Sequence, residues 1–249
     1  MKTLLLASVA LFGLVGVAAA ADLPRRAAPL APAPLPVFTW TGFYAGLQVG
    51  GAWGRDRASL FLDDRTPFEF GGFGGLTGNR LTYDIDGVVG GGHVGFNYQV
   101  GPVVWGVEGD IEGSGIEGRR AVSDGPLSIA AKTEIDWLSS IRGRVGLAFD
   151  RTLFYATGGM VVGEITNTYT STGFGAPGPD RSTFAEWGWT AGGGIEHAFT
   201  NSLSARVEYR YTQFETFENR APLNTSGIVR HEPDFHAIRG GVSYKFFTQ

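Results

Sequence analysis

The chain has 249 residues and a formal net charge of −4, so neither nucleic acid nor an anionic membrane surface is an expected partner. It contains no cysteine, which excludes a disulfide framework and any metal site built from thiolates. Its 39 glycines stand beside 18 phenylalanines, 8 tyrosines and 6 tryptophans. Glycine at this level argues against a helical protein because it destabilises helix interiors.

The first 21 residues have the pattern of a secretory signal peptide. A short basic start at 1–3 precedes an uncharged apolar run at 4–17 and the alanines at 18–21. The alternative is a membrane-anchor helix, but the apolar run is short for a span and the small-residue tail favours cleavage. We therefore predict an exported protein with a signal peptide over 1–21.

A proline-rich stretch comes next, with five prolines between 21 and 36. Such a composition is typical of an extended, semi-rigid linker. We predict a periplasmic linker over 22–39, which serves either as a tether or as a disordered leader. No later segment has 18 consecutive apolar residues, so no transmembrane helix is expected after the signal peptide.

From Trp40 onward the apolar pattern has a period of two, which indicates β-strands. The predicted strands cover 41–54, 87–100, 103–113, 134–149, 152–165, 186–199, 203–214 and 235–246. Short turns near 99–102, 150–151 and 200–202 alternate with long polar connections near 55–82, 114–133, 166–185 and 215–234. This alternation predicts an all-β, eight-stranded antiparallel up-and-down barrel over 40–249.

Each predicted strand has two faces of different character. In 134–149, Trp137, Ile141 and Val145 alternate with Arg142 and Arg144, so the arginines share a face with small and acidic residues. Ile135 falls on the apolar face by the same count. Strand 152–165 is apolar on both sides, and the residues that we assign to its outer face are Leu153, Tyr155, Val161 and Ile165.

Two kinds of barrel fit this pattern. A soluble lipocalin-like barrel has its apolar face inside, whereas a transmembrane barrel has it outside. Aromatic residues at both ends of the apolar faces favour the transmembrane barrel, because they match the two interfacial girdles of such proteins. These residues are Phe43, Trp53, Tyr98, Trp105, Trp137, Phe149, Trp187, Phe199, Tyr211, Tyr244 and Phe246.

The charged faces then point into the lumen, where we predict an ion-pair network. Its members are Glu108, Asp110, Glu112, Asp136, Glu186, Glu196 and Glu208 with Arg142, Arg144, Arg206, Arg210, Arg239 and Lys245. Eight strands enclose a space that side chains can fill. A nearly balanced set of seven acids and six bases therefore predicts a plug, with a narrow charged pore as the alternative.

Two further motifs, and the absence of a third, bear on other functions. The glycines of 90–95 match a dinucleotide fingerprint, but a strand follows where that motif needs a helix. His231, Asp234 and His236 are candidates for haem or metal contact, and ordinary loop polarity is the favoured interpretation. No G-x-S-x-G nucleophile motif occurs, so no enzymatic activity, catalytic residue, cofactor or metal is predicted.

Several segments together carry a family resemblance: ADLP at 21–24, WTGFYAGL at 40–47, RGRVG at 142–146 and RGGVSYKF at 239–246. With the signal peptide, they resemble the alphaproteobacterial outer-membrane immunogenic proteins, which are small porin-family barrels similar to the transmembrane domain of OmpA. The resemblance implies an outer-membrane barrel with antigenic loops and a role in envelope integrity. Some relatives are described as porins or as haem-binding.

The same resemblance implies the partners: outer-membrane lipid, lipopolysaccharide and the barrel assembly machinery. Family members usually end on a phenylalanine that follows alternating apolar residues, as the signal for assembly. Val242, Tyr244 and Phe246 match this pattern, although three more residues follow Phe246.

Overall fold

The computed structural model describes residues 38–61, 80–124, 127–172, 179–220 and 228–246. The predicted signal peptide and the predicted linker up to residue 37 lie outside the described residues. Within the described ranges, no helix is long and apolar enough to cross a membrane.

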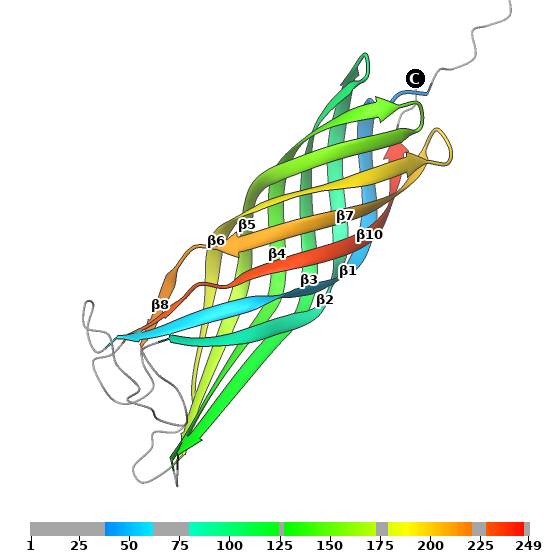
Figure 1. Ribbon diagram of the computed structural model, residues 1–249. Helices are drawn as coiled ribbons and strands as arrows, with labels where there is room; N and C mark the ends of the chain where they lie inside the picture. Colours follow the sequence, from blue (N-terminus) through cyan, green and yellow to red (C-terminus); the bar gives the residue numbers. More distant parts are fainter. Residues whose placement is uncertain (1–37, 62–79, 125–126, 173–178, 221–227, 247–249) are drawn as a thin grey trace, which may run out of the picture. The chain divides into compact units, whose positions relative to one another are not determined.

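Eight strands form a closed antiparallel ring (Figure 1). They are β1 (Gly42–Phe61), β2 (Arg80–Val100), β3 (Val103–Asp124), β4 (Leu127–Phe149), β5 (Thr152–Thr172), β6 (Asp180–Ala198), β7 (Leu203–Phe214) and β10 (Asp234–Phe246). Each strand pairs with the next along the chain, and β10 pairs with β1 to close the ring. The predicted fold class and strand number are therefore confirmed.

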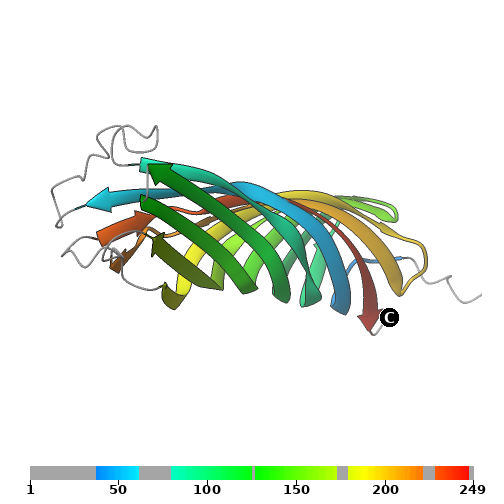
Figure 2. The ribbon, with the colours of Figure 1, turned by 90° about the horizontal axis from the view of Figure 1, so that it is seen from below.

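Tight turns connect the strands at one end of the ring. Gly101 (φ +59°) and Asp150 (φ +52°) adopt the left-handed conformation that such turns require, and the Phe199 amide donates to the Leu203 carbonyl at 2.9 Å. The start of β1 and the end of β10 lie at this same end, side by side in both views (Figures 1 and 2). The three predicted turns are therefore confirmed.

At the other end, much of what the sequence predicted as long connections is strand, and that part of the prediction was wrong. The predicted connections at 62–79 and 221–227 lie outside the described residues. The strands run far into the segments expected to be connections, and two short strands, β8 (Phe217–Arg220) and β9 (Ile228–His231), continue β7 and β10. The reason is that a strand outside a membrane can carry polar residues on its outer face, so alternation fades while the hydrogen-bonded ladder continues. Threonine-rich stretches such as 166–172 suit a strand because their side chains are β-branched.

The outer surface of the ring carries a band of exposed apolar and aromatic side chains. Ile141 is 64% exposed and Val145 40% exposed, whereas Arg142 and Arg144 between them are buried. The band includes Phe43, Leu47, Trp53, Val94, Tyr98, Trp105, Ile111, Phe149, Met160, Trp187, Trp189, Phe199, Val207, Ile238, Val242, Tyr244 and Phe246. The transmembrane orientation of the faces is what the sequence predicted.

Two face assignments were wrong. In β5 the outer residues are Phe154 and Met160, while Leu153, Tyr155, Val161 and Ile165 are buried inside. This strand lines the parts of the interior that are themselves apolar, so its two faces could not be told apart by polarity. In β4 a bulge between Ile135 and Trp137 leaves Asp136 unpaired with β5, which turns Ile135 inward and Asp136 outward.

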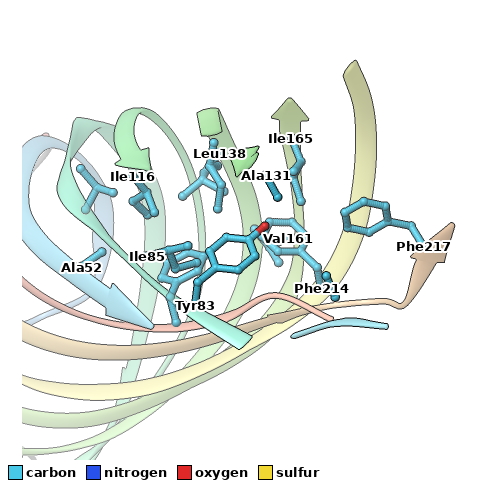
Figure 3. Close-up of a cluster of buried hydrophobic side chains, with 14 of the residues drawn as sticks. Ala52, Tyr83, Ile85, Ile116, Ala131, Leu138, Val161, Ile165, Phe214 and Phe217 are labelled. Atoms are coloured by element: carbon cyan, nitrogen blue, oxygen red, sulfur yellow. The ribbon is translucent and has the colours of Figure 1, made fainter. Parts of the chain in front are cut away.

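The interior of the ring is filled in layers. Towards the end away from the tight turns lies an apolar cluster, whose side chains turn toward one another inside the ring (Figure 3). It includes Ala52, Tyr83, Ile85, Ile116, Ala131, Ile135, Leu138, Val161, Ile165, Phe214 and Phe217. A second apolar cluster lies at the tight-turn end and contains Trp40, Val104, Ala148, Leu153, Tyr155 and Ala198. The charged residues lie between these two clusters.

Candidate functional site: the charged lumen

Arg142 on β4 is the centre of the charged layer. Its Nη2 donates to Glu108 Oε1 at 2.6 Å and to Asp110 Oδ2 at 2.9 Å. Its Nη1 donates to Glu208 Oε1 at 2.9 Å, and its Nε donates to Ser140 Oγ at 3.1 Å. The guanidinium thus joins carboxylates from β3 and β7 on opposite sides of the ring, and the Arg142 side chain is fully buried.

Arg144 lies two residues after Arg142 on β4, closer to the tight-turn end. Its Nη2 donates to Glu196 Oε2 at 2.9 Å and its Nη1 donates to the Tyr44 hydroxyl at 3.0 Å. The guanidinium carbon lies 4.0 Å from the ring centroid of Tyr155, which is cation–π geometry. The Tyr44 hydroxyl in turn donates to Glu108 Oε2 at 2.7 Å, so Arg144 is linked to the carboxylates around Arg142.

Two arginines on β7 extend the network. Arg206 donates to Glu108 Oε2 through Nη1 at 2.5 Å and to Gln48 Oε1 through Nη2 at 2.5 Å. Arg210 donates to Glu208 Oε1 through Nε at 3.0 Å and through Nη2 at 2.8 Å. Glu208 is therefore shared by two arginines, and Glu108 by three, because Arg144 Nη1 also lies 3.8 Å from Glu108 Oε2.

The last arginine, Arg239 on β10, makes a two-point contact with Glu112. Its Nε and Nη2 donate to the two carboxylate oxygens, each at 2.9 Å. Gln48 Nε2 donates to Glu112 Oε1 at 2.7 Å. The network therefore contains five arginines and five carboxylates, so its net charge is zero: Arg142, Arg144, Arg206, Arg210 and Arg239 with Glu108, Asp110, Glu112, Glu196 and Glu208.

Three residues of the predicted network lie elsewhere. Asp136 is exposed on the outer face because of the β4 bulge. Glu186 is half-buried on β6 beyond the last β6–β7 pair, and no ion pair of its side chain occurs within the described ranges. Lys245 Nζ donates to the Thr39 carbonyl and lies 4.7 Å from the Phe38 ring centroid, at the tight-turn rim. Counting alternate residues detects neither a bulge nor how far along the barrel axis a side chain lies.

Trp40 closes the tight-turn end below the charged layer. Its side chain is buried among Val104, Leu153 and other members of the second apolar cluster, and Phe38 packs edge-on against it at 5.2 Å. Its backbone amide donates to Gln99 Oε1 at 2.8 Å. A cavity of ≈ 20 Å³ remains beside it, which is room for about one water molecule.

The two histidines proposed for haem or metal contact do not meet. His231 on β9 is fully buried and its Nδ1 lies 2.9 Å from Asp56 Oδ2. His236 on β10 is on the outer face, where its Nδ1 lies 2.7 Å from the Tyr209 hydroxyl. Asp234 pairs with Arg57 at 2.6 Å. These residues therefore have separate structural partners, and no group of metal-ligating side chains occurs within the described ranges.

The network also has uncharged members that a search for charge does not predict, and Tyr44, Gln48 and Tyr155 are among them. Tyr44 and Gln48 stand on the inner face of β1, where the alternation itself places them. Tyr155 was assigned to the outside, yet its hydroxyl donates to Glu208 Oε2 at 2.9 Å. A rule that includes every hydrogen-bonding side chain on the inner face finds Tyr44 and Gln48 but not Tyr155.

Curated relatives match the chain over nearly its whole length. The 31 kDa outer-membrane immunogenic protein of Brucella melitensis is 31% identical over 255 residues, which cover 99% of this chain and 100% of that protein. The 22 kDa outer membrane protein of Rhizobium leguminosarum is 31% identical over 85% of this chain and 80% of its own length.

A solved structure shares the fold. The outer membrane protease OmpT from Escherichia coli covers 84% of this chain and 98% of its own, with a TM-score of 0.50 and 10% sequence identity. A family model described as "outer membrane protein beta-barrel domain" matches residues 7–246. The resemblance drawn from the sequence motifs is thus confirmed. The chain belongs to this outer-membrane β-barrel family, together with the immunogenic proteins of Brucella, and is a protein of the Gram-negative outer membrane.

Proposed function

We propose that this protein is a structural barrel of the outer membrane whose lumen is closed, and which contributes to envelope integrity while it presents its outer end as a surface antigen. The observation that carries the proposal is the neutral network of five arginines and five carboxylates across the ring. The network fills the space that an open pore needs, and its members are buried.

The apolar clusters on both sides of the network support the same function. Trp40 closes the tight-turn end, and the larger cluster around Ile85 and Phe235 closes the other. A continuous water path through the lumen has to cross both clusters as well as the ion pairs, and apolar constrictions exclude water and ions. The alternative is a small-solute porin, and liposome swelling distinguishes the two functions.

The outer surface supports insertion by the usual route for this family. The band of exposed apolar side chains suits lipid, and its aromatic ends suit the two interfaces. Val242, Tyr244 and Phe246 at the end of β10 are all exposed on this face. We propose them as the signal for the assembly machinery, with lipid and lipopolysaccharide as the surroundings of the finished barrel.

A non-enzymatic role fits the relatives, which are named as immunogenic outer-membrane proteins. OmpT is a protease, but the likeness to it concerns the fold alone. Haem binding between His231 and His236 has no support, because one side chain is inside the barrel and the other is outside it.

Liposome swelling tests the closed lumen. The protein is refolded into liposomes loaded with an impermeant polymer, which are then diluted into an isosmotic solution of a small sugar. Vesicles with this protein should swell no faster than empty vesicles, whereas vesicles with a general porin should swell quickly. Sugar-dependent swelling that scales with the amount of folded protein would contradict the proposal and favour the porin.

The general porin shows that the assay can detect an open lumen. A matched variant of this protein removes one ion pair of the network while both apolar clusters stay in place, so its vesicles should still not swell. Replacing Arg239 and Glu112 together by alanine removes one complete ion pair and leaves no unpaired charge from that pair. The heat-dependent gel shift typical of folded barrels identifies folded protein in each preparation, so a failure to fold is not mistaken for a closed lumen.

A further inference from the structure

The outer end of the barrel divides into two separate sheets. The β2–β3 ladder ends at the pair Asp86–Glu117, and the β6–β7 ladder ends at Gly188–Phe214. Beyond these points β8, β9 and the outer ends of β1 and β2 remain paired with one another, and so do the outer ends of β3 to β6. We name these sheets the β1 blade and the β4 blade; Figure 1 shows their ends diverging.

The blades face each other across the larger apolar cluster. The β1 blade contributes Tyr83, Ile85 and Val229, and the β4 blade contributes Ala131 and Ile165, all of them buried. Figure 3 shows several of these side chains meeting from different strands. Beyond the two end points the Glu215 amide donates to the Trp187 carbonyl at 2.8 Å, but no further backbone ladder joins the blades within the described ranges. Side-chain contacts therefore supply most of what holds the blades together.

A group of polar side chains crosses between the blades within this apolar cluster. Asp56 Oδ2 accepts hydrogen bonds from the Tyr83 hydroxyl at 2.8 Å and from Thr133 Oγ1 at 3.0 Å, and lies 2.9 Å from His231 Nδ1. His231 Nε2 is hydrogen-bonded to the Tyr169 hydroxyl. Asp56, Tyr83 and His231 belong to the β1 blade, whereas Thr133 and Tyr169 belong to the β4 blade, so these bonds connect the two sheets.

One more polar residue, Asn167, completes this group, against which Phe217 packs. Thr133 Oγ1 also lies 2.7 Å from the side-chain amide of Asn167, and Phe217 stacks on His231 with a centroid distance of 5.3 Å and an interplanar angle of 12°. We name the six polar residues the latch: Asp56, Tyr83, Thr133, Asn167, Tyr169 and His231. Asp56 and His231 are fully buried.

The latch makes this part of the apolar cluster less stable than purely apolar packing would. Asp56 Oδ1 is buried and has no hydrogen-bond partner within the described ranges. A partly satisfied polar group inside an apolar cluster is less stable than apolar packing of the same shape. The latch therefore joins the blades through contacts that are easier to break than a continuous core.

We propose that the outer end of the barrel is a two-bladed clamp, in which the latch holds the β1 and β4 blades together and the blades part when it breaks, while the ring within the membrane stays closed. Parting exposes the apolar faces of both blades on the cell surface. The membrane ring is held by continuous ladders and by the charged network, neither of which includes a latch residue.

Cysteine accessibility tests the clamp cleanly because the chain has no cysteine of its own. Ala131→Cys places a thiol between the blades, and Ala198→Cys places one in the cluster at the opposite end of the barrel. Each is made in the otherwise unaltered protein and in two latch variants, Asp56→Asn and Tyr169→Phe. The full chain is refolded into liposomes, and the rate of labelling by a water-soluble maleimide is measured at neutral pH.

With the latch intact, both thiols should be labelled slowly. In each latch variant the thiol at 131 should be labelled about tenfold faster or more, because a broken buried hydrogen bond favours local opening, while the rate at 198 stays unchanged. Equal rates at 131 with and without the latch would overturn the proposal. So would a parallel increase at 198, since the whole barrel would then be loosened. If Asp56→Asn fails to fold, Tyr169→Phe, which removes a single hydroxyl, decides the outcome alone.

Discussion

Arg142 Nη1 and Glu208 Oε1 lie 2.9 Å apart inside the barrel, although 66 residues separate them in the chain and their strands do not neighbour each other in the ring. The contact spans the lumen from β4 to β7. A pair that crosses the ring fills it and also braces one wall against the other. The same guanidinium holds Glu108 and Asp110 on β3, so a single side chain links three strands.

Replacing Arg142 by methionine is expected to destabilise the barrel strongly. The change preserves much of the side-chain volume but leaves three buried carboxylates without one of their partners. Removing one member of a buried ion pair costs roughly 3–5 kcal/mol. Urea unfolding of the refolded protein in micelles, followed by tryptophan fluorescence, measures the free energy of unfolding.

Lys132→Met is the control for that substitution. Lys132 pairs with Glu117 and Glu134 on the outer surface, where solvent weakens ion pairs. Its removal should leave the unfolding midpoint unchanged within error. Equal losses for the two variants would show that the lumen pairs are no more important than surface pairs.

Val145→Arg should impair insertion into bilayers because Val145 lies in the exposed apolar band. An arginine at the midplane of a lipid-facing barrel surface costs about 2–4 kcal/mol. Folding yield in liposomes, read from the gel shift between heated and unheated samples, should fall relative to Val145→Leu. If both variants fold with equal yield, then the assignment of this face to lipid is wrong.

Trp40→Ala should destabilise the barrel without opening it. Trp40 is buried in the cluster at the tight-turn end, and loss of a buried tryptophan costs roughly 3–5 kcal/mol. The charged layer above it remains complete, so the liposomes should still not swell. Swelling with this variant alone would mean that Trp40, and not the ion-pair network, closes the lumen.

Acid should loosen the two blades through Asp56. Burial raises the pKa of this carboxyl, but hydrogen bonds from His231, Tyr83 and Thr133 and the charge of His231 outweigh it and hold the pKa below its ordinary 3.8. The groups that face Asp56 are these three side chains, and Tyr169 lies behind His231. A carboxyl with a lowered pKa adds stability above its ordinary pKa and loses it as pH falls through the folded value.

Hydrogen exchange measures this loss. As pH falls below the ordinary carboxyl pKa of 3.8, protection of the amides in 228–231 should fall, after correction for the intrinsic exchange rate. In Asp56→Asn the protection should be lower from the start and should show no such step. An equal step in Asp56→Asn would assign the acid effect to a different group.

Much of the barrel was predictable because it depends on alternation. The strand number, the short turns and the burial of Arg142 and Arg144 follow from a period of two and from turn residues such as Gly101 and Asp150. Alternation alone places the ten charged residues of the network on the inner faces of their strands. It does not predict their partners, because a pair such as Arg142 and Glu208 depends on the tilt and register of strands on opposite walls.

The predictions that were wrong have local structural causes. One inserted residue at the β4 bulge places Asp136 outside the lumen. No neighbouring residue in the sequence indicates the bulge. The outer strands are rich in polar residues, and polarity alone predicts loops there. Asp56 and His231 lie in those segments, so the sequence does not predict that they form a buried pair.

The central claim is that side chains close the lumen. Single-channel recording of the refolded protein in a planar lipid bilayer tests it most directly, with folded insertion confirmed by the gel shift of the same preparation. The account predicts a flat baseline under applied voltage, with no steady conductance step as more protein inserts. Reproducible, well-resolved steps of one size would contradict it, because they would show a continuous water path past Arg142 and its carboxylates.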